Sequence, residues 1–278
     1  MPALISCLTN SYFRFGAQVA IESLPSAGIH HIELPIRTAG VESMFKDKPL
    51  VTTESNMNDL KTVDRLLEKH RVRVSSCTVT GGDPLDPEVL ALTKRKLDLA
   101  SHFGVARVVG GAGEADDPAS LEILYRQHRE IGDYAGNLGI TYCFETHPGI
   151  CQDHYGMLET MQALDHPHLK LNFDTANILY YNENIQGEIA LAKVCHHVRH
   201  LHLKDSHGEY GQWYFPALGR GGAVDFVRVL ELMRTCGFDG PYSLEIEGIT
   251  GEGELSLEEY QQRIVESVEH LQNCGYFD

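Results

Sequence analysis

Four short segments of this 278-residue chain each end a strand-like apolar run at an acidic or histidine side chain. They read CFETH at 143–147, NFDTAN at 172–177, HLHLKD at 200–205 and SLEIEG at 243–248. Each then continues into residues that are typical of loops. Carboxylate oxygens and imidazole nitrogens bind divalent cations, so the residue types and their positions predict a metal site.

One residue from each segment could serve as a ligand, and successive candidates lie about one strand-helix unit apart: Glu145, Asp174, His202 and Glu245. In a barrel of parallel strands, the C-terminal strand ends meet at one face, so these side chains would converge. A single acid at a strand end could instead cap a helix or form an ion pair. Several buried carboxylates together would repel one another without a cation, and we therefore expect one divalent ion.

Two of the segments contain a second residue that could take the same role. Strand side chains alternate between two faces, so His200 shares a face with His202, and Glu247 shares one with Glu245. We favour His202 because it lies nearer the C-terminal end of its strand. A donor set of three carboxylates and one imidazole suits Mn²⁺ best, with Mg²⁺, Co²⁺ or Zn²⁺ as alternatives.

Strand-like and helical patterns alternate along the whole chain and would hold these residues in place. Short runs rich in Val, Ile and Leu are typical of an enclosed parallel sheet, and we expect strands at 4–8, 31–34, 72–79, 106–109, 140–145, 169–174, 198–203 and 242–247. Asp86 and Asp117 each precede a proline at the first helical position, and Ser256 opens a capping box. Helices are expected at 17–24, 58–70, 86–103, 117–138, 154–164, 185–195, 224–236 and from 256 onward.

This alternation predicts an α/β fold, a (β/α)8 TIM barrel formed as one domain over residues 1–278. A doubly wound open sheet is the main alternative. It would place a glycine-rich phosphate loop after the first strand, and LTNSYF at 8–13 is not such a loop. The glycine cluster at 110–113 is interpreted as a tight turn after the fourth strand.

Composition excludes several classes of protein. The formal net charge of −16 disfavours nucleic acid as a partner, because an acidic surface repels phosphates. No apolar run approaches the roughly 18 residues of a membrane span, and the N-terminus does not resemble a signal peptide, so we expect a cytoplasmic protein. A homo-oligomer is compatible with the sequence. The seven cysteines are scattered without a CxxC pair and are expected to be free, buried thiols.

The four segments, with PALGRGGAVDF at 216–226 between the last two, resemble those of the xylose-isomerase-like TIM barrels. More narrowly, they are similar to the sugar phosphate isomerase/epimerase group, which includes tagatose 3-epimerase, hydroxypyruvate isomerase and inosose isomerase. The resemblance covers the whole chain, since HIEL at 31–34 matches that family's second strand. It favours Glu245 over Glu247 as the ligand, and it implies that Glu145 and Glu245 are both metal ligands and catalytic acid-base groups.

The same resemblance implies an isomerase or epimerase of a keto-sugar, which would move a proton through a metal-stabilised cis-enediolate. The chain departs from the family pattern at Asn177, where relatives often have histidine, and at Arg220, where an acid is common. The expected substrate contacts are His147, Asn177, Lys204, Arg220 and Glu247. The aromatic loop around Trp213 is expected to cover a bound small carbohydrate.

Two other activities fit the same scaffold. A metal-dependent dehydratase of a keto-polyol would use the same cation and base, and the sequence leaves it open. An endonuclease IV-type DNA-repair nuclease resembles this barrel as well, but it would need further histidines on the early strands. The third and fourth expected strands contain none, and the net charge of −16 also disfavours DNA.

Overall fold

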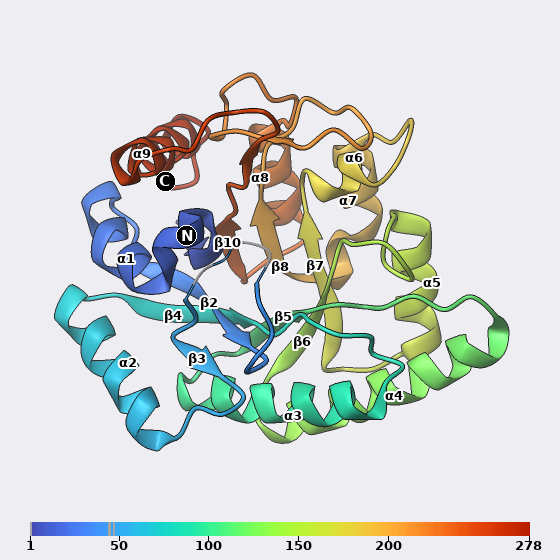
Figure 1. Ribbon diagram of the computed structural model, residues 1–278. Helices are drawn as coiled ribbons and strands as arrows, with labels where there is room; N and C mark the ends of the chain where they lie inside the picture. Colours follow the sequence, from blue (N-terminus) through green and yellow to red (C-terminus); the bar gives the residue numbers. More distant parts are fainter. Residues whose placement is uncertain (1, 44–45, 47) are drawn as a thin grey trace.

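The chain closes a parallel β-barrel that is surrounded by helices (Figure 1). The computed structural model describes residues 2–43, 46 and 48–278. Within them, eight barrel strands pair side by side in the order β1 (Leu4–Leu8), β10 (Pro241–Leu244), β8 (Val198–Leu203), β7 (Leu169–Asp174), β6 (Thr141–Glu145), β5 (Arg107–Gly110), β4 (Arg73–Thr78) and β2 (His31–Arg37), and the short ninth strand β3 (Val51–Thr52) also pairs with β2. Strand β1 also pairs with β2, which closes the sheet on itself. The predicted (β/α)8 barrel is therefore confirmed.

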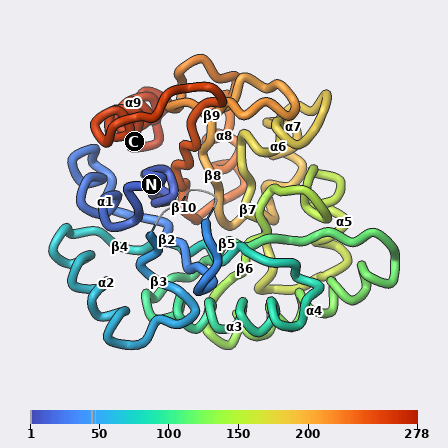
Figure 2. The backbone as a smooth tube through the Cα atoms, in the orientation of Figure 1, coloured from blue at the N-terminus to red at the C-terminus, as the bar shows by residue number. Residues whose placement is uncertain are grey.

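Helices follow the strands and form the outer layer, as the tube in Figure 2 also shows. They are α1 (Gly16–Ser23), α2 (Met57–His70), α3 (Pro87–His102), α4 (Pro118–Asn137), α5 (His154–Leu164), α6 (Asn177–Tyr180), α7 (Gly187–Val194), α8 (Phe226–Thr235) and α9 (Leu257–Asn273), with 3-10 turns η1 (Thr9–Phe15), η2 (Leu24–Ala27) and η3 (Cys195–His197). The predicted caps are confirmed: Asp86 and Asp117 accept backbone N–H groups at the starts of α3 and α4, and Ser256 forms its capping box with Glu259.

The last barrel strand ends earlier than the sequence pattern indicates. The backbone N–H of Glu245 still bonds the carbonyl of Leu203 at 3.0 Å, but the N–H of Ile246 donates to Ser11 Oγ at 3.0 Å. The chain then forms β11 (Gly248–Ile249), which pairs antiparallel with β9 (Tyr214–Phe215). This pairing joins the long loop after β8 to the end of β10, and it brings the aromatic loop to the barrel mouth.

The inside and outside of the barrel differ in character. Outward-facing strand residues such as Phe144 and Phe173 pack in the apolar core beneath the helices. The interior is instead lined by buried polar side chains, among them Glu33, Ser76, Asn172, His200 and Ser243. Buried polar groups require hydrogen-bond partners, and Asn172 and Ser76 both bond the ring of His200 across the barrel.

Two of the seven cysteines contradict the expectation of free thiols. Cys195 and Cys236 form a disulfide, although 41 residues separate them in the sequence. They meet because α7 and α8 pack against each other and each cysteine follows the last residue of one of these helices. The remaining cysteines are free: Cys7, Cys77, Cys143 and Cys151 are buried, and Cys274 is partly exposed.

No helix within the described part of the chain is both long and apolar enough to span a bilayer.

Candidate metal centre at the barrel mouth

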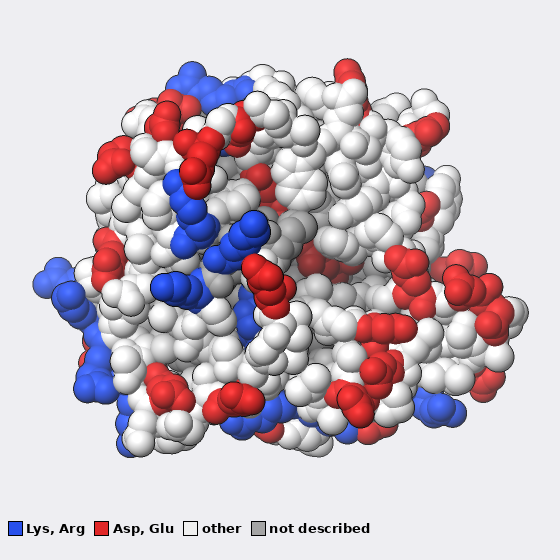
Figure 3. Space-filling view, in the orientation of Figure 1, with Lys and Arg blue, Asp and Glu red and all other residues white. Residues whose placement is uncertain are grey.

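Four side chains predicted from the sequence to converge do lie together at the C-terminal end of the barrel. We call this group the mouth cluster: Glu145, Asp174, His202 and Glu245. Each residue offers one ligand atom, these atoms lie within 4.8 Å of one another, and all four residues are buried. They stand at the ends of the adjacent strands β6, β7, β8 and β10. Figure 3 shows acidic side chains within the hollow of this face, with Lys and Arg side chains beside it.

Two carboxylate oxygens of the mouth cluster are buried without a hydrogen-bond partner. Asp174 Oδ1 accepts the N–H groups of Ala176 and Asn177, both at 2.8 Å, but its Oδ2 has no such partner, and neither has Glu245 Oε2. Burial, with Glu245 nearby, raises the pKa of Asp174 to about 8 although Lys204 opposes the shift. A divalent cation would satisfy both oxygens and compensate their charge, so the donor set fits one.

The imidazole of His202 is oriented from behind by a carboxylate. Its Nε2 donates to Glu33 Oε2 at 3.0 Å, and its Nδ1 lies 3.1 Å from Glu245 Oε2 and 3.4 Å from Glu145 Oε1. Burial alone would lower the pKa of His202, but Glu33 and Glu245 raise it well above its ordinary value. A hydrogen bond to the far nitrogen fixes the ring so that the near nitrogen can bind a metal.

Glu33 is a functional candidate that the motif analysis missed. It lies in the middle of β2, is fully buried and approaches both His202 and His200, the latter at 3.5 Å. Burial would raise the pKa of Glu33, yet the two histidines lower it. One signal was present in the sequence: an acid within the apolar run HIEL is unusual, because buried strands rarely carry an unpaired charge.

The structure separates His200 from the mouth cluster. Its ring bonds Asn172 Oδ1 through Nδ1 and Ser76 Oγ through Nε2, both at 2.9 Å. Burial lowers its pKa to about 3, so the ring is neutral at physiological pH. Both ring nitrogens are satisfied within the barrel, and His202 is the histidine that faces the three carboxylates.

Lys204 places a buried positive charge directly beside the mouth cluster. Its ammonium forms an ion pair with Glu247, lies 3.7 Å from Glu245 Oε2 and donates to Asn177 Oδ1 at 3.2 Å. Burial would lower the pKa of Lys204, but Glu245 and Glu247 raise it. Burial raises the pKa of Glu247 to about 7, against the influence of Lys204. Lys204, Asn177 and Glu247, which were all expected to contact the substrate, thus form one network beside the mouth cluster.

Aromatic side chains form the wall next to this network. The Lys204 ammonium lies 4.2 Å from the centre of the Phe215 ring. Trp213 Nε1 donates to the carbonyl of Glu247 at 3.2 Å, and its ring packs against those of Phe215 and Tyr180. The loop therefore contacts the network directly, which is compatible with the predicted aromatic cover.

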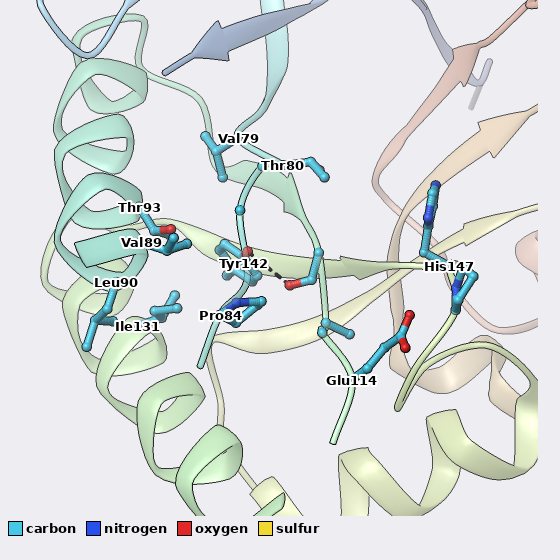
Figure 4. A pocket seen from close by; sticks show the side chains of 16 residues that line it. Val79, Thr80, Pro84, Val89, Leu90, Thr93, Glu114, Ile131, Tyr142 and His147 are labelled. Carbon is cyan, nitrogen blue, oxygen red and sulfur yellow. Dashed lines mark hydrogen bonds between the residues drawn. The ribbon is translucent and has the colours of Figure 1, made fainter. Parts of the chain in front are cut away.

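His147 follows the end of β6 and borders a separate cavity. Its ring centre lies 5.1 Å from that of Tyr181. The cavity has a volume of about 220 Å³ and extends outward between the loops after β4 and β5, with Tyr142 at its wall and Glu114 near His147 (Figure 4). His147 thus lines this cavity, two residues after Glu145 of the mouth cluster.

Arg220 is turned away from the mouth cluster. Its Nε lies 2.9 Å from Glu266 Oε2 on α9, and its side chain is 61% exposed. The loop is held by Asp205, whose carboxylate accepts the N–H groups of Ser206 at 2.9 Å and Gly219 at 2.8 Å. A Cβ on Gly222 would lie 1.8 Å from Asp205 Oδ1, so only glycine fits there. This arrangement directs Arg220 toward α9.

Comparisons with known proteins agree with this architecture. The family model described as xylose isomerase-like TIM barrel matches residues 21–274. A comparison with curated protein sequences found no match.

Several solved structures share the fold over nearly the full chain. A xylose isomerase-like TIM barrel protein from Mycobacterium smegmatis, in complex with magnesium, has a TM-score of 0.73 at 17% identity, covering 98% of this chain and 97% of that one. D-allulose 3-epimerase from Methylomonas sp. has a TM-score of 0.72 at 17% sequence identity, and the match covers 98% of each chain. A probable 3-DHS dehydratase involved in petrobactin synthesis, from Bacillus anthracis, has a TM-score of 0.71 at 16% sequence identity. The match covers 97% of this chain and 99% of that one.

Proposed function

We propose, since this chain belongs to the xylose isomerase-like TIM barrel family, that it is a divalent-metal-dependent isomerase or epimerase of a keto-sugar or a related polyhydroxy carbonyl compound. The observation that carries the proposal is the pair of buried, unpartnered oxygens on Asp174 and Glu245 that face His202 Nδ1. The epimerases among the structural relatives support it at the level of fold.

The mouth cluster would hold the cation, with Mn²⁺ as the favoured ion. When bound, the cation would polarise a substrate carbonyl and stabilise negative charge on its oxygen, which can lower the barrier by several kcal/mol. Glu33 would keep the His202 ring in place. The side-chain amide of Asn177 donates to the carbonyl of Thr146 at 3.1 Å. This hydrogen bond connects the loops that follow β6 and β7.

Glu145 and Glu245 are proposed as the proton carriers. Both approach His202 Nδ1, Glu145 at 3.4 Å and Glu245 at 3.1 Å, and β7 and β8 lie between their strands. One carboxylate would remove a proton from the carbon next to the substrate carbonyl, and the other would return a proton. Return to the opposite face of the same carbon is epimerisation, and return to the neighbouring carbon is aldose-ketose isomerisation.

The polar side chains around the cluster are proposed to bind the substrate. Lys204 and Glu247 offer a donor and an acceptor beside the carboxylates, and His147 follows the end of β6, two residues after Glu145. The acidic hollow and the net charge of −16 favour a small carbohydrate over a nucleic acid. A dehydratase is the second candidate, favoured by the relative that is a probable 3-DHS dehydratase.

The experiment is a panel of keto-sugars, free and phosphorylated, incubated in D₂O with Mn²⁺ or with EDTA. We expect deuterium at one α-carbon of the true substrate with Mn²⁺ and none with EDTA, as read by mass spectrometry and NMR. Loss of water from the substrate would instead identify the dehydratase. Equal exchange in the presence of EDTA would contradict the metal-dependent mechanism.

A further inference from the structure

A second group of metal-binding side chains lies at the end of the barrel opposite the mouth. Cys195, His196 and Cys236 each offer one ligand atom, and these atoms lie within 4.8 Å of one another. Cys195 and His196 belong to η3, directly before β8 begins, and Cys236 follows α8, shortly before β10 begins. Barrel strands run from this face toward the mouth, so the group is separate from the mouth cluster.

The residue types of this group suit a different metal from that of the mouth. Two thiolates and one imidazole are softer donors than carboxylates and are typical ligands of zinc. In the structure the two sulfurs are joined as a disulfide, and the Cα atoms lie 6.1 Å apart. In the reduced protein, two tetrahedral Zn–S bonds of about 2.3 Å would place the sulfurs about 3.8 Å apart. Rotation about the two Cα–Cβ bonds can supply that change.

Access to the group is also favourable. Cys195 is buried against the helices, whereas Cys236 is half-buried and His196 is exposed. Because the His196 side chain is exposed, its ring can turn toward the sulfurs, and water can fill a fourth position. None of the three residues takes part in the network described for the mouth, so a metal here would serve a purpose other than proton transfer.

We propose that Cys195, Cys236 and His196 form a redox-gated zinc site that connects the ends of α7 and α8. On binding, the two thiols each release a proton and both sulfurs bond to the ion. A small-molecule disulfide oxidises the site: it accepts two electrons and two protons from the Cys195 and Cys236 thiols and leaves as two small thiols. The oxidised protein then has no free thiolate for the metal. The sulfurs are then bonded to each other and cannot bind zinc.

The test uses Co²⁺ as a spectroscopic substitute for Zn²⁺ on the full-length protein. Cobalt bound by thiolates gives a near-ultraviolet charge-transfer band, which the oxygen and nitrogen ligands of the mouth cannot produce. We expect this band in reduced wild type, its loss on adding Zn²⁺, and no band in protein oxidised with a small disulfide. Absence of the band in fully reduced wild type would overturn the proposal.

Variants assign the ligands. Cys195→Ser and Cys236→Ser should each lose the band, and His196→Ala should weaken cobalt binding at least about tenfold. Cys274→Ser is the matched control: Cys274 lies 3.6 Å from His270 Nε2 but has no second thiol, so this variant should keep the band. A band that persists in Cys195→Ser, or an unchanged affinity in His196→Ala, would contradict the assignment.

A measurement on wild type alone covers the case in which a variant fails to fold. Reduced protein is alkylated with iodoacetamide with and without Zn²⁺, and each cysteine is quantified by mass spectrometry. Zinc should protect Cys195 and Cys236 but not Cys274. Equal labelling of Cys195 and Cys236 under both conditions would overturn the proposal.

Discussion

His200 and His202 lie two residues apart on β8, and both rings point into the barrel, yet their surroundings are opposite in kind. His200 hydrogen-bonds the neutral side chains of Asn172 and Ser76, and burial lowers its pKa to about 3 although Glu33, 3.5 Å away, opposes the shift. His202, one layer nearer the mouth, faces carboxylates that raise its pKa well above the ordinary value. In the lower layer, both ring nitrogens of His200 have neutral hydrogen-bond partners, whereas in the upper layer, beside His202, the oxygens Asp174 Oδ2 and Glu245 Oε2 are buried without a hydrogen bond.

This difference separates two uses of buried polar side chains. Where every donor and acceptor is paired, the polar groups stabilise the barrel and need nothing else. Where oxygens stay unpaired beside a correctly oriented nitrogen, a ligand is required to complete the set. A change in the upper layer should therefore affect metal binding and catalysis, and a change in the lower layer should affect stability.

The largest expected effect is the loss of a proton carrier from the upper layer. Glu145→Gln or Glu245→Gln should each lower turnover about 10²–10⁴-fold, because the amide cannot exchange a proton. The measurement is the rate of deuterium incorporation into the substrate identified by the panel. Glu266→Gln, which alters a carboxylate on α9 outside the mouth, is the control and should keep its activity. Near-normal turnover in either mouth variant would exclude that residue as a carrier.

A buried neutral histidine outside the barrel tests the stability side of the comparison. His128 lies on α4, bonds the carbonyl of Ala112 at 2.6 Å, and burial lowers its pKa to about 4 from 6.5. Above pH 6.5 the ring is neutral in both states, and its contribution to stability is fully present. As the pH falls below 6.5, only the unfolded chain binds the proton, so stability is lost down to about pH 4, in total on the order of 3 kcal/mol.

The check is the free energy of unfolding of wild type and His128→Gln across this pH range. The free energy of unfolding of the variant should fall less steeply as the pH is lowered, because its unfolding takes up as much as one proton fewer. Identical slopes would show that His128 does not stay neutral in the folded state.

Removing the support behind His202 should have a smaller effect than removing a proton carrier. Glu33→Gln weakens the acceptor for His202 Nε2 and should lower Mn²⁺ affinity about 10–100-fold. Ser76→Ala, which alters only the lower layer, should leave the affinity unchanged and reduce stability. The Mn²⁺ affinity of each variant is measured by isothermal titration calorimetry. Equal affinities in the Glu33→Gln and Ser76→Ala variants would show that Glu33 does not support metal binding through His202.

The smallest expected effect concerns Arg220, whose partner Glu266 lies outside the mouth. An exposed ion pair contributes about 0–1 kcal/mol, so Arg220→Ala should barely change stability. Its expected contact with the substrate is tested by kinetics. A strongly raised KM with little change in kcat would support that role, because uniform binding would have been removed. An unchanged KM would assign Arg220 to the ion pair alone.

Local patterns in the sequence determined much of this protein. The barrel followed from alternating apolar runs and helix caps, which depend on neighbours only a few residues apart. The mouth cluster followed from one topological rule, since C-terminal ends of parallel strands meet at one face. In the structure, the ligand atoms of the same four residues that the sequence predicted lie within 4.8 Å of one another.

Other features depended on which side chains meet across the barrel, and only the tertiary structure decided them. The choice between His200 and His202 rests on partners contributed by other strands, and Glu33 approaches His202 from 169 residues away. The direction of Arg220 depends on a loop held by Asp205, and the disulfide depends on the packing of two helices. A residue's type and its neighbours in sequence determine what chemistry it can do, but its partners in space are set by packing between distant segments.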